Sequence, residues 1–128
     1  MAGMSIDKLK KILLGRQTPP DVVPPVAAMR KSMEKMAFKA ADDIETEAVT
    51  VAGRDAEWVR APGSQADRAI LYLHGGGYVM GSINTHRSLA GEISRAAQAT
   101  VLLVDYRMAP EDPYPAPNDD CEAAATWL

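Results

Sequence analysis

Two long apolar runs in the second half of the chain, separated by a helical pattern, restrict the fold more than any other feature. The runs are AILYLHGG at 69–76 and TVLLVDYR at 100–107. Neither alternates with polar residues, which is typical of strands buried on both faces of a sheet. Between them, apolar side chains recur at helical spacing through 85–98. This order predicts an α/β fold with a mostly parallel sheet and helices on both faces.

The preceding residues are predicted to form two helices and two weaker strands. The predicted helices are SIDKLKKILLG at 5–15 and PVAAMRKSMEKMAFKAA at 25–41, and the predicted strands are IETEAVTV at 44–51 and AEWVRAPG at 56–63. Ser5 can cap the first helix and Gly15 can end it. A further helix is predicted from Pro117 or Asn118 onward.

Composition and charge exclude several classes of protein. A hydrophobic fraction of 47% is enough for a core, and a net charge of −3 argues against a nucleic-acid partner. No run approaches the roughly 18 apolar residues of a membrane helix, and the run at 12–14 is too short for a signal peptide. We therefore expect a cytoplasmic protein without stable membrane insertion. The single cysteine, Cys121, is expected to be a small apolar residue at the start of a helix.

The sequence HGGG at 74–77 follows the first apolar run, at the end of a strand where open α/β sheets place their sites. Glycine has no Cβ, so consecutive glycines can present backbone N–H groups to one ligand at close range. Two such donors suit an oxyanion, and each is worth about 3–4 kcal/mol at an acyl-transfer transition state. A phosphate-binding loop would need a lysine that is missing here, and a dinucleotide fingerprint would need glycine in place of Met80. A plain tight turn remains the alternative.

An HGGG motif contributes to the oxyanion hole in lipases and esterases of the α/β-hydrolase fold. HGGGYVMGS at 74–82, THR at 85–87 and VLLVDYRMAPEDPYPAPNDDCEAAATWL at 101–128 together resemble the hormone-sensitive-lipase family of esterases, also called bacterial family IV. The similarity runs through residues 68–128. It implies a helical cap segment at 1–43 and the first half of the catalytic domain at 44–128.

The resemblance implies a role for each residue of the glycine loop. Gly76 and Gly77 would supply backbone amides to the oxyanion hole, and Gly75 would shape the turn. His74 would anchor the loop and is not the triad base, because the histidine of this fold follows the serine along the chain. Tyr78 is expected either to line the substrate pocket or to pack within the loop.

Other polar residues near the motifs are expected to be structural. His86 opens the predicted helix at 85–98 and is not expected to be catalytic. Asp105 precedes the place of the triad acid in chain order, so a structural pair involving Asp105, Arg107 or Glu111 is the preferred interpretation. The loop at 109–115 contains X-Pro bonds of the kind that are sometimes cis.

The nucleophile is absent from these residues. No G-x-S-x-G sequence occurs, and the chain ends in DDCEAAATWL without a helix stop signal. We therefore expect the N-terminal part of an esterase whose serine, acid and histidine lie beyond residue 128.

The expected function is hydrolysis of short- to medium-chain acyl esters by a serine nucleophile, without metal or cofactor. The expected partner is a small-molecule ester, and a homodimer is left open. Met29, Met33 and Met36 either pack a helix on its neighbour or form an adaptable lid over an apolar ligand. The alternatives are a lactone or arylacetamide hydrolase of the same fold and a catalytically inactive, receptor-like binding protein.

Overall fold

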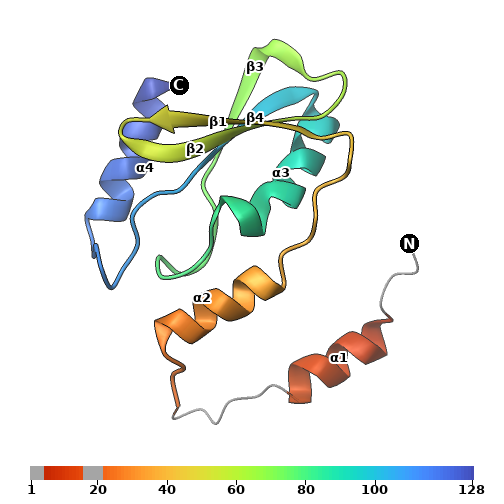
Figure 1. The fold of residues 1–128 in the computed structure, drawn as a ribbon, viewed down its shortest axis with the longest axis vertical. Helices are drawn as coiled ribbons and strands as arrows, with labels where there is room; N and C mark the ends of the chain where they lie inside the picture. Colours follow the sequence, from red (N-terminus) through yellow and green to blue (C-terminus); the bar gives the residue numbers. More distant parts are fainter. Residues whose placement is uncertain (1–4, 16–21) are drawn as a thin grey trace.

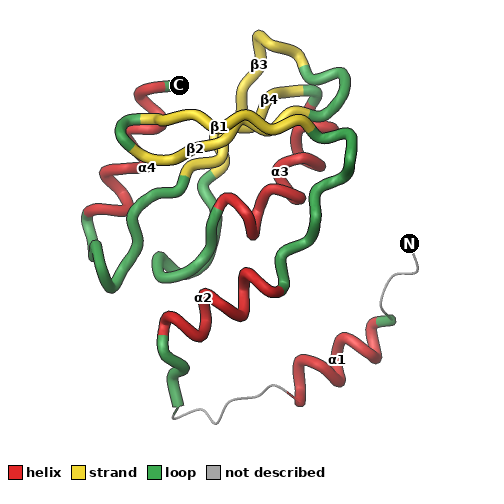
Figure 2. The backbone as a smooth tube through the Cα atoms, in the orientation of Figure 1, coloured by secondary structure: helices red, strands yellow, loops and turns green. Residues whose placement is uncertain are grey.

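The computed structural model describes residues 5–15 and 22–128, which form four helices and four strands in the order shown in Figure 1. The elements are α1 (Ile6–Gly15), α2 (Val26–Lys35), β1 (Glu45–Val51), β2 (Arg54–Arg60), β3 (Gln65–Tyr72), α3 (Ile83–Ala97), β4 (Ala99–Val104) and α4 (Ala116–Trp127). Figure 2 shows the strands gathered into one sheet, with α3 and α4 beside it.

The sheet has the strand order β1-β2-β4-β3 and is mixed. The predicted strand–helix–strand unit is present, because β3 and β4 pair in parallel and α3 connects them. The two weaker strands predicted before it, β1 and β2, form an antiparallel hairpin, and β2 also pairs antiparallel with β4. One of the three pairings among the described strands is therefore parallel.

The core lies on both faces of β4, whose six residues are all buried. Val101 and Leu103 pack in one cluster with Ala90 of α3, whereas Leu102 and Val104 pack in another with Ala124 of α4. Side chains alternate between the faces of a strand, so a helix on each face requires an apolar residue at every position. This explains the unbroken apolar run that the sequence shows there.

The prediction that the run at 69–76 is buried on both faces is wrong for the described structure. The strand ends at Tyr72, and the side chains of β3 are exposed or half-buried. β3 is an edge strand of the sheet, with only β4 beside it. Its Leu71 packs against the α4 side of the core, and Ile70 packs against the α3 side.

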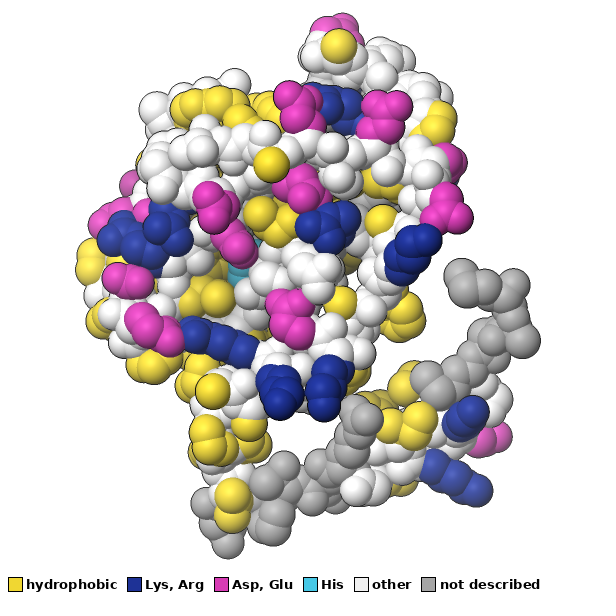
Figure 3. All heavy atoms as spheres, viewed as in Figure 1, with side chains coloured by type: hydrophobic (Ala, Val, Ile, Leu, Met, Phe, Trp, Pro, Cys, Tyr) yellow, Lys and Arg dark blue, Asp and Glu magenta, His cyan; other side chains and the backbone are white. Residues whose placement is uncertain are grey.

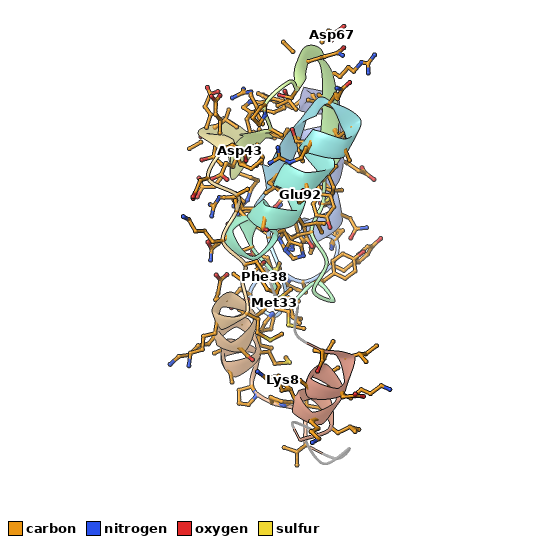
Figure 4. The ribbon with its side chains drawn as sticks, turned by 90° about the vertical axis from the view of Figure 1, so that its right-hand side faces the viewer. Lys8, Met33, Phe38, Asp43, Asp67 and Glu92 are labelled. Atoms are coloured by element: carbon orange, nitrogen blue, oxygen red, sulfur yellow. The ribbon has the colours of Figure 1, made fainter. Side chains whose placement is uncertain are left out.

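The N-terminal helices have no buried residues. Ser5 caps α1 as predicted, because the Lys8 amide donates to its hydroxyl over 3.3 Å. In contrast, α2 ends at Lys35, earlier than the predicted boundary at residue 41. Figure 4 shows α2, labelled at Met33, next to the sheet unit, whereas α1, labelled at Lys8, lies apart from it. The division into a cap at 1–43 and a domain from residue 44 remains a prediction, and residues 1–4 and 16–21 lie outside the described structure.

Candidate active site

The glycine loop connects the end of β3 to the first turn of α3. Its backbone has positive φ angles of 137° at Gly76, 63° at Gly77, 63° at Tyr78 and 104° at Gly81. The amides of Val79 and Met80 both donate to the carbonyl of Gly76, over 3.3 and 3.2 Å. These bonds turn the chain sharply and close the loop on itself.

The need for glycine differs among the four positions of the loop. At Gly76 an added Cβ would lie 1.9 Å from the carbonyl oxygen of Met80, and at Gly81 it would lie 2.4 Å from Nδ1 of His74. At Gly77 it would meet nothing within 4 Å, so only the backbone angle favours glycine. Gly75 has neither a positive φ nor a close neighbour, so the backbone does not account for the turn-shaping role expected there. Gly81 was not predicted as a site residue.

The amides of Gly76 and Gly77 have no acceptor within the described part of the chain. Both residues line a pocket of ≈ 470 Å³. The rest of its wall is contributed by the neighbouring loop residues, the residue after Asp105 and one side of α4, namely Leu73, His74, Gly75, Tyr78, Tyr106, Asn118, Cys121 and Glu122. Two residues whose amides have no acceptor in the described structure thus line a cavity that is large enough for a small organic ligand.

His74 is buried behind the loop, with 3% of its surface exposed. Its Nδ1 lies 2.9 Å from the carbonyl oxygen of Gly75, and the Tyr106 hydroxyl donates to its backbone carbonyl. The Tyr106 ring stacks on the imidazole with ring centres 4.4 Å apart. Burial lowers the pKa of His74 below its ordinary 6.5, so the ring is neutral at pH 7. The role of His74 as a loop anchor stays a prediction with which these contacts agree, and Tyr106 is a partner that the sequence did not reveal.

Asp105 and His86 lie beside His74. Asp105 accepts a hydrogen bond from the Ile83 amide over 3.4 Å, and its Oδ1 lies 4.0 Å from Nε2 of His74. Burial raises the pKa of Asp105. His86 stacks on His74 at 5.3 Å and contacts the Thr85 hydroxyl through Nδ1. Asp105 and His86 therefore lie beside His74 and the start of α3.

The ion pairs expected around Arg107 and Glu111 exist, but with partners that were not predicted. Arg107 binds Asp120 of α4 over 2.8 Å, and the Arg107 amide donates to the same carboxylate. Burial opposes ionisation of Asp120, but these hydrogen bonds outweigh it and lower its pKa. Glu111 pairs with Arg30 of α2. Both partners lie far away in sequence, so no local pattern identifies them.

The peptide bonds before Pro110 and Pro115 are both cis, within the predicted loop. Tyr78 is among the residues that line the pocket, and its carbonyl accepts from the Ala109 amide over 2.8 Å. Cys121 lies inside α4 and also lines the pocket. Burial raises the pKa of its thiol, which disfavours the reactive thiolate.

Among residues 5–15 and 22–128, no group of three or more His, Cys, Asp or Glu side chains is placed to hold a metal ion. None of the helices described is both long and apolar enough to cross a membrane. On the face shown in Figure 3, acidic and basic side chains are interspersed without a large patch of either sign.

Comparison with known proteins connects this geometry to a family. A family model described as the α/β hydrolase fold matches residues 70–128. An acetyl-hydrolase of Streptomyces hygroscopicus is 49% identical over 80 residues, which are 62% of this chain and 26% of that protein. An ethyl acetate hydrolase of Pseudomonas putida is 44% identical over 63 residues, which are 49% of this chain and 20% of that protein.

Solved structures cover almost the whole chain. An esterase/lipase from an uncultured bacterium is 68% identical, with a TM-score of 0.91, over 99% of this chain and 43% of that one. A structure of the esterase EstE5 soaked with p-nitrophenyl butyrate is 68% identical, with a TM-score of 0.91, over 99% of this chain and 43% of that one. A structure described as EstE5-PMSF is 67% identical, with a TM-score of 0.90, over 98% of this chain and 43% of that one. An esterase of the bacterial hormone-sensitive lipase family is 45% identical, with a TM-score of 0.83, over 94% of this chain and 40% of that one.

The described residues therefore form part of an α/β-hydrolase fold. Residues 70–128 match the α/β-hydrolase family model, and the solved structures similar to the chain include an esterase of the bacterial hormone-sensitive lipase family, in line with the resemblance of its motifs. It spans about a quarter of the curated acetyl-hydrolase and about two fifths of the solved esterases.

Proposed function

We propose that the protein carrying this chain is a carboxylic ester hydrolase with a serine nucleophile, and that the loop at 74–77 supplies part of its oxyanion hole. The observation that carries the proposal is that Gly76 and Gly77 both line the pocket, and that their amides lack an acceptor within the described residues. Donors that are fixed before substrate arrives stabilise developing charge without further reorganisation.

The mechanism follows from the position of these donors. A serine hydroxyl attacks the ester carbonyl carbon while a histidine takes the hydroxyl proton, and the carbonyl oxygen becomes an oxyanion that the Gly76 and Gly77 N–H groups bind. The C–O bond to the alcohol then breaks, and the histidine returns the proton to the leaving oxygen. Water releases the acid from the acyl-enzyme by the same steps. The proposal places the serine, its histidine and the acid outside residues 1–128, because no G-x-S-x-G sequence occurs within them.

The proposed substrates are small esters with short to medium acyl chains. A pocket of ≈ 470 Å³ suits a ligand of this size. A second hollow of ≈ 520 Å³ lies between α2 and Met80 and is lined almost wholly by apolar side chains. Its lining residues are Pro24, Ala28, Met29, Ser32, Met33, Met36 and Met80. This hollow supports the interpretation of the methionine helix as an adaptable apolar wall. The ethyl acetate hydrolase and the esterase soaked with p-nitrophenyl butyrate support the same class of substrate.

Hydrolysis of p-nitrophenyl butyrate by the full-length protein tests the proposal. We expect turnover that a serine-directed organophosphate abolishes, with one serine labelled per chain. Residues 1–128 alone are the control and should show no turnover. Binding of esters without turnover or labelling would refute the esterase proposal and favour the receptor-like alternative. Selective hydrolysis of lactones or aryl amides would instead favour a lactone or arylacetamide hydrolase of the same fold.

The proposal extends to a cytoplasmic protein that acts on a dissolved small molecule. Fractionation of cells that express the full-length protein tests the location. The molar mass by light scattering decides whether a homodimer forms.

A further inference from the structure

One arginine of α2 contacts two loops that are distant from it in sequence. Nε of Arg30 donates to the carbonyl of Val79 in the glycine loop over 2.6 Å, and Nη2 donates to the carbonyl of Ala109 over 3.0 Å. Nη1 and Nη2 also donate to the two carboxylate oxygens of Glu111, over 2.7 and 2.8 Å. A single guanidinium therefore connects the N-terminal helix, the glycine loop and the loop of cis prolines.

The segment that Arg30 holds belongs to the strained part of the glycine loop. Tyr78, which is not a glycine, has a φ of 63°, and its carbonyl accepts from the Ala109 amide over 2.8 Å. The next carbonyl, that of Val79, accepts from Arg30. Sparsely populated backbone conformations persist only where the surroundings constrain them. Bonds inside the loop, from the Val79 and Met80 amides to the Gly76 carbonyl, supply part of this constraint, and Ala109 and Arg30 supply the rest from outside it.

A second residue of α2 binds the end of the same loop. Glu34 accepts hydrogen bonds from the Ser82 hydroxyl over 2.5 Å and from the Asn84 side chain over 2.7 Å. Arg30 and Glu34 are four residues apart, so they lie on one face of the helix. That face runs along the loop from its middle to its end, which agrees with the position of α2 beside the sheet unit in Figures 1 and 4.

We propose that Arg30 is a positioning residue for the oxyanion hole, which sets the place of the Gly76 and Gly77 amides by holding the Val79 carbonyl. The inference rests on the proposed function. Through this polar connection α2 affects the position of the oxyanion donors, in addition to any apolar contact that α2 makes with substrate.

The contacts of Arg30 favour this role over a contribution to stability alone. The side chains of Arg30 and Glu111 are 31% and 59% exposed, and ion pairs at such positions add little to stability. The arrangement of donors is nevertheless specific, because the guanidinium fork serves two carbonyls and a carboxylate at once. A lysine ammonium, as a point charge on a flexible stem, does not reproduce that fork. Hydrogen bonding to Arg30 lowers the pKa of Glu111 to about 2, so the pair is ionised throughout the pH range of an esterase assay.

The first test compares Arg30→Met and Arg30→Lys with a matched control in the full-length protein. The control is Arg95→Met, because Arg95 also makes a bidentate pair, with Asp43, and its side chain is 38% exposed, but it lies on α3 away from the loop. We expect Arg30→Met to lower kcat about tenfold with little change in KM, since a charged hydrogen bond to the loop is lost. Arg30→Lys should recover only part of this loss. Wild-type kcat in Arg30→Met would overturn the proposal.

A boronic acid inhibitor separates positioning from partial unfolding. If the amides are displaced, the inhibition constant for the tetrahedral adduct should rise by the same factor as kcat/KM falls. A merely structural role would lower the fraction of titratable active sites and leave the inhibition constant unchanged, which would also overturn the proposal.

Hydrogen exchange tests the inference without relying on activity. The Met80 and Ala109 amides bond across the loop, to Gly76 and to Tyr78, and report its closure. We expect both to exchange about tenfold faster in Arg30→Met than in Arg95→Met. If the wild-type protein hydrolyses no ester, the proposed function fails, and this measurement still decides whether Arg30 positions the loop. Equal exchange in the two variants would refute that role.

Discussion

An alanine at Gly76 would place its methyl group against backbone atoms that have little freedom to move. The new Cβ would lie 1.9 Å from the carbonyl oxygen of Met80 and 2.6 Å from its carbonyl carbon, at a φ of 137°. Overpacking costs about 1–3 kcal/mol and a positive φ costs about 1–2 kcal/mol for a residue with a Cβ, so the variant should lose about 2–5 kcal/mol. Gly63→Ala is the matched control, because Gly63 has a φ of 83° with nothing within 4 Å of the new Cβ, and should cost only about 1–2 kcal/mol.

The assay combines urea unfolding of the full-length protein with kcat for p-nitrophenyl butyrate. Gly76→Ala should also lower kcat about a hundredfold, because a shifted loop misplaces the oxyanion donors, whereas Gly63→Ala should leave kcat unchanged. Gly77→Ala should lose about 1–2 kcal/mol, as Gly63→Ala does, because its φ is 63° and its Cβ meets nothing within 4 Å. A loss of kcat beyond that of Gly63→Ala would reflect a methyl group in the pocket. Equal stability and equal kcat in Gly76→Ala and Gly63→Ala would refute the reasoning.

The remaining predictions concern the core and the buried charges around the site. Leu102→Ala should destabilise the protein by about 2–5 kcal/mol in urea unfolding, because Leu102 is fully buried. A smaller loss would show that the surrounding core repacks to fill the cavity. Asp120→Asn should lower the free energy of unfolding by about 1.5–3 kcal/mol, because its bonds to Arg107 are weakened. The control Asp119→Asn changes an exposed residue and should stay within about 0.5 kcal/mol. Equal losses in the two variants would contradict the role of the Arg107–Asp120 pair. Burial lowers the pKa of His74 in the folded protein. Below pH 6.5 the imidazole is therefore protonated in the unfolded chain but stays neutral in the folded one. Stability should therefore fall as the pH drops below 6.5, with a shallower slope in His74→Asn, and identical slopes would show that His74 is not responsible.

The sequence was sufficient to predict the strand–helix–strand unit and the glycine loop, because both depend on local patterns. The six buried residues of β4 produce an unbroken apolar run, and the helical spacing of 85–98 corresponds to α3. The burial of β3 could not be predicted from the same kind of run, because exposure depends on which strands lie beside it. Among the described residues β3 lies at the end of the strand order, and the chain spans 43% of the solved esterase.

The motif also identified the loop residues of the candidate site, but not what holds them. Gly81 lies against His74 because the loop folds back. Tyr106 contacts His74 because the two residues follow the neighbouring parallel strands β4 and β3. Arg30 is separated from Val79 by 49 residues and from Glu111 by 81. One signal was available in the chain: Arg30 and Glu34 place opposite charges four residues apart on a helix that also carries Met29 and Met33.

The central claim is that the Gly76 and Gly77 amides bind the oxyanion, and a crystal structure of the full-length protein with a phosphonate bound to its serine tests this most directly. The account predicts that one phosphonate oxygen lies about 2.7–3.1 Å from the backbone nitrogens of both glycines. It also predicts that His74 remains buried behind the loop. An adduct whose oxygen points away from both amides would contradict the account.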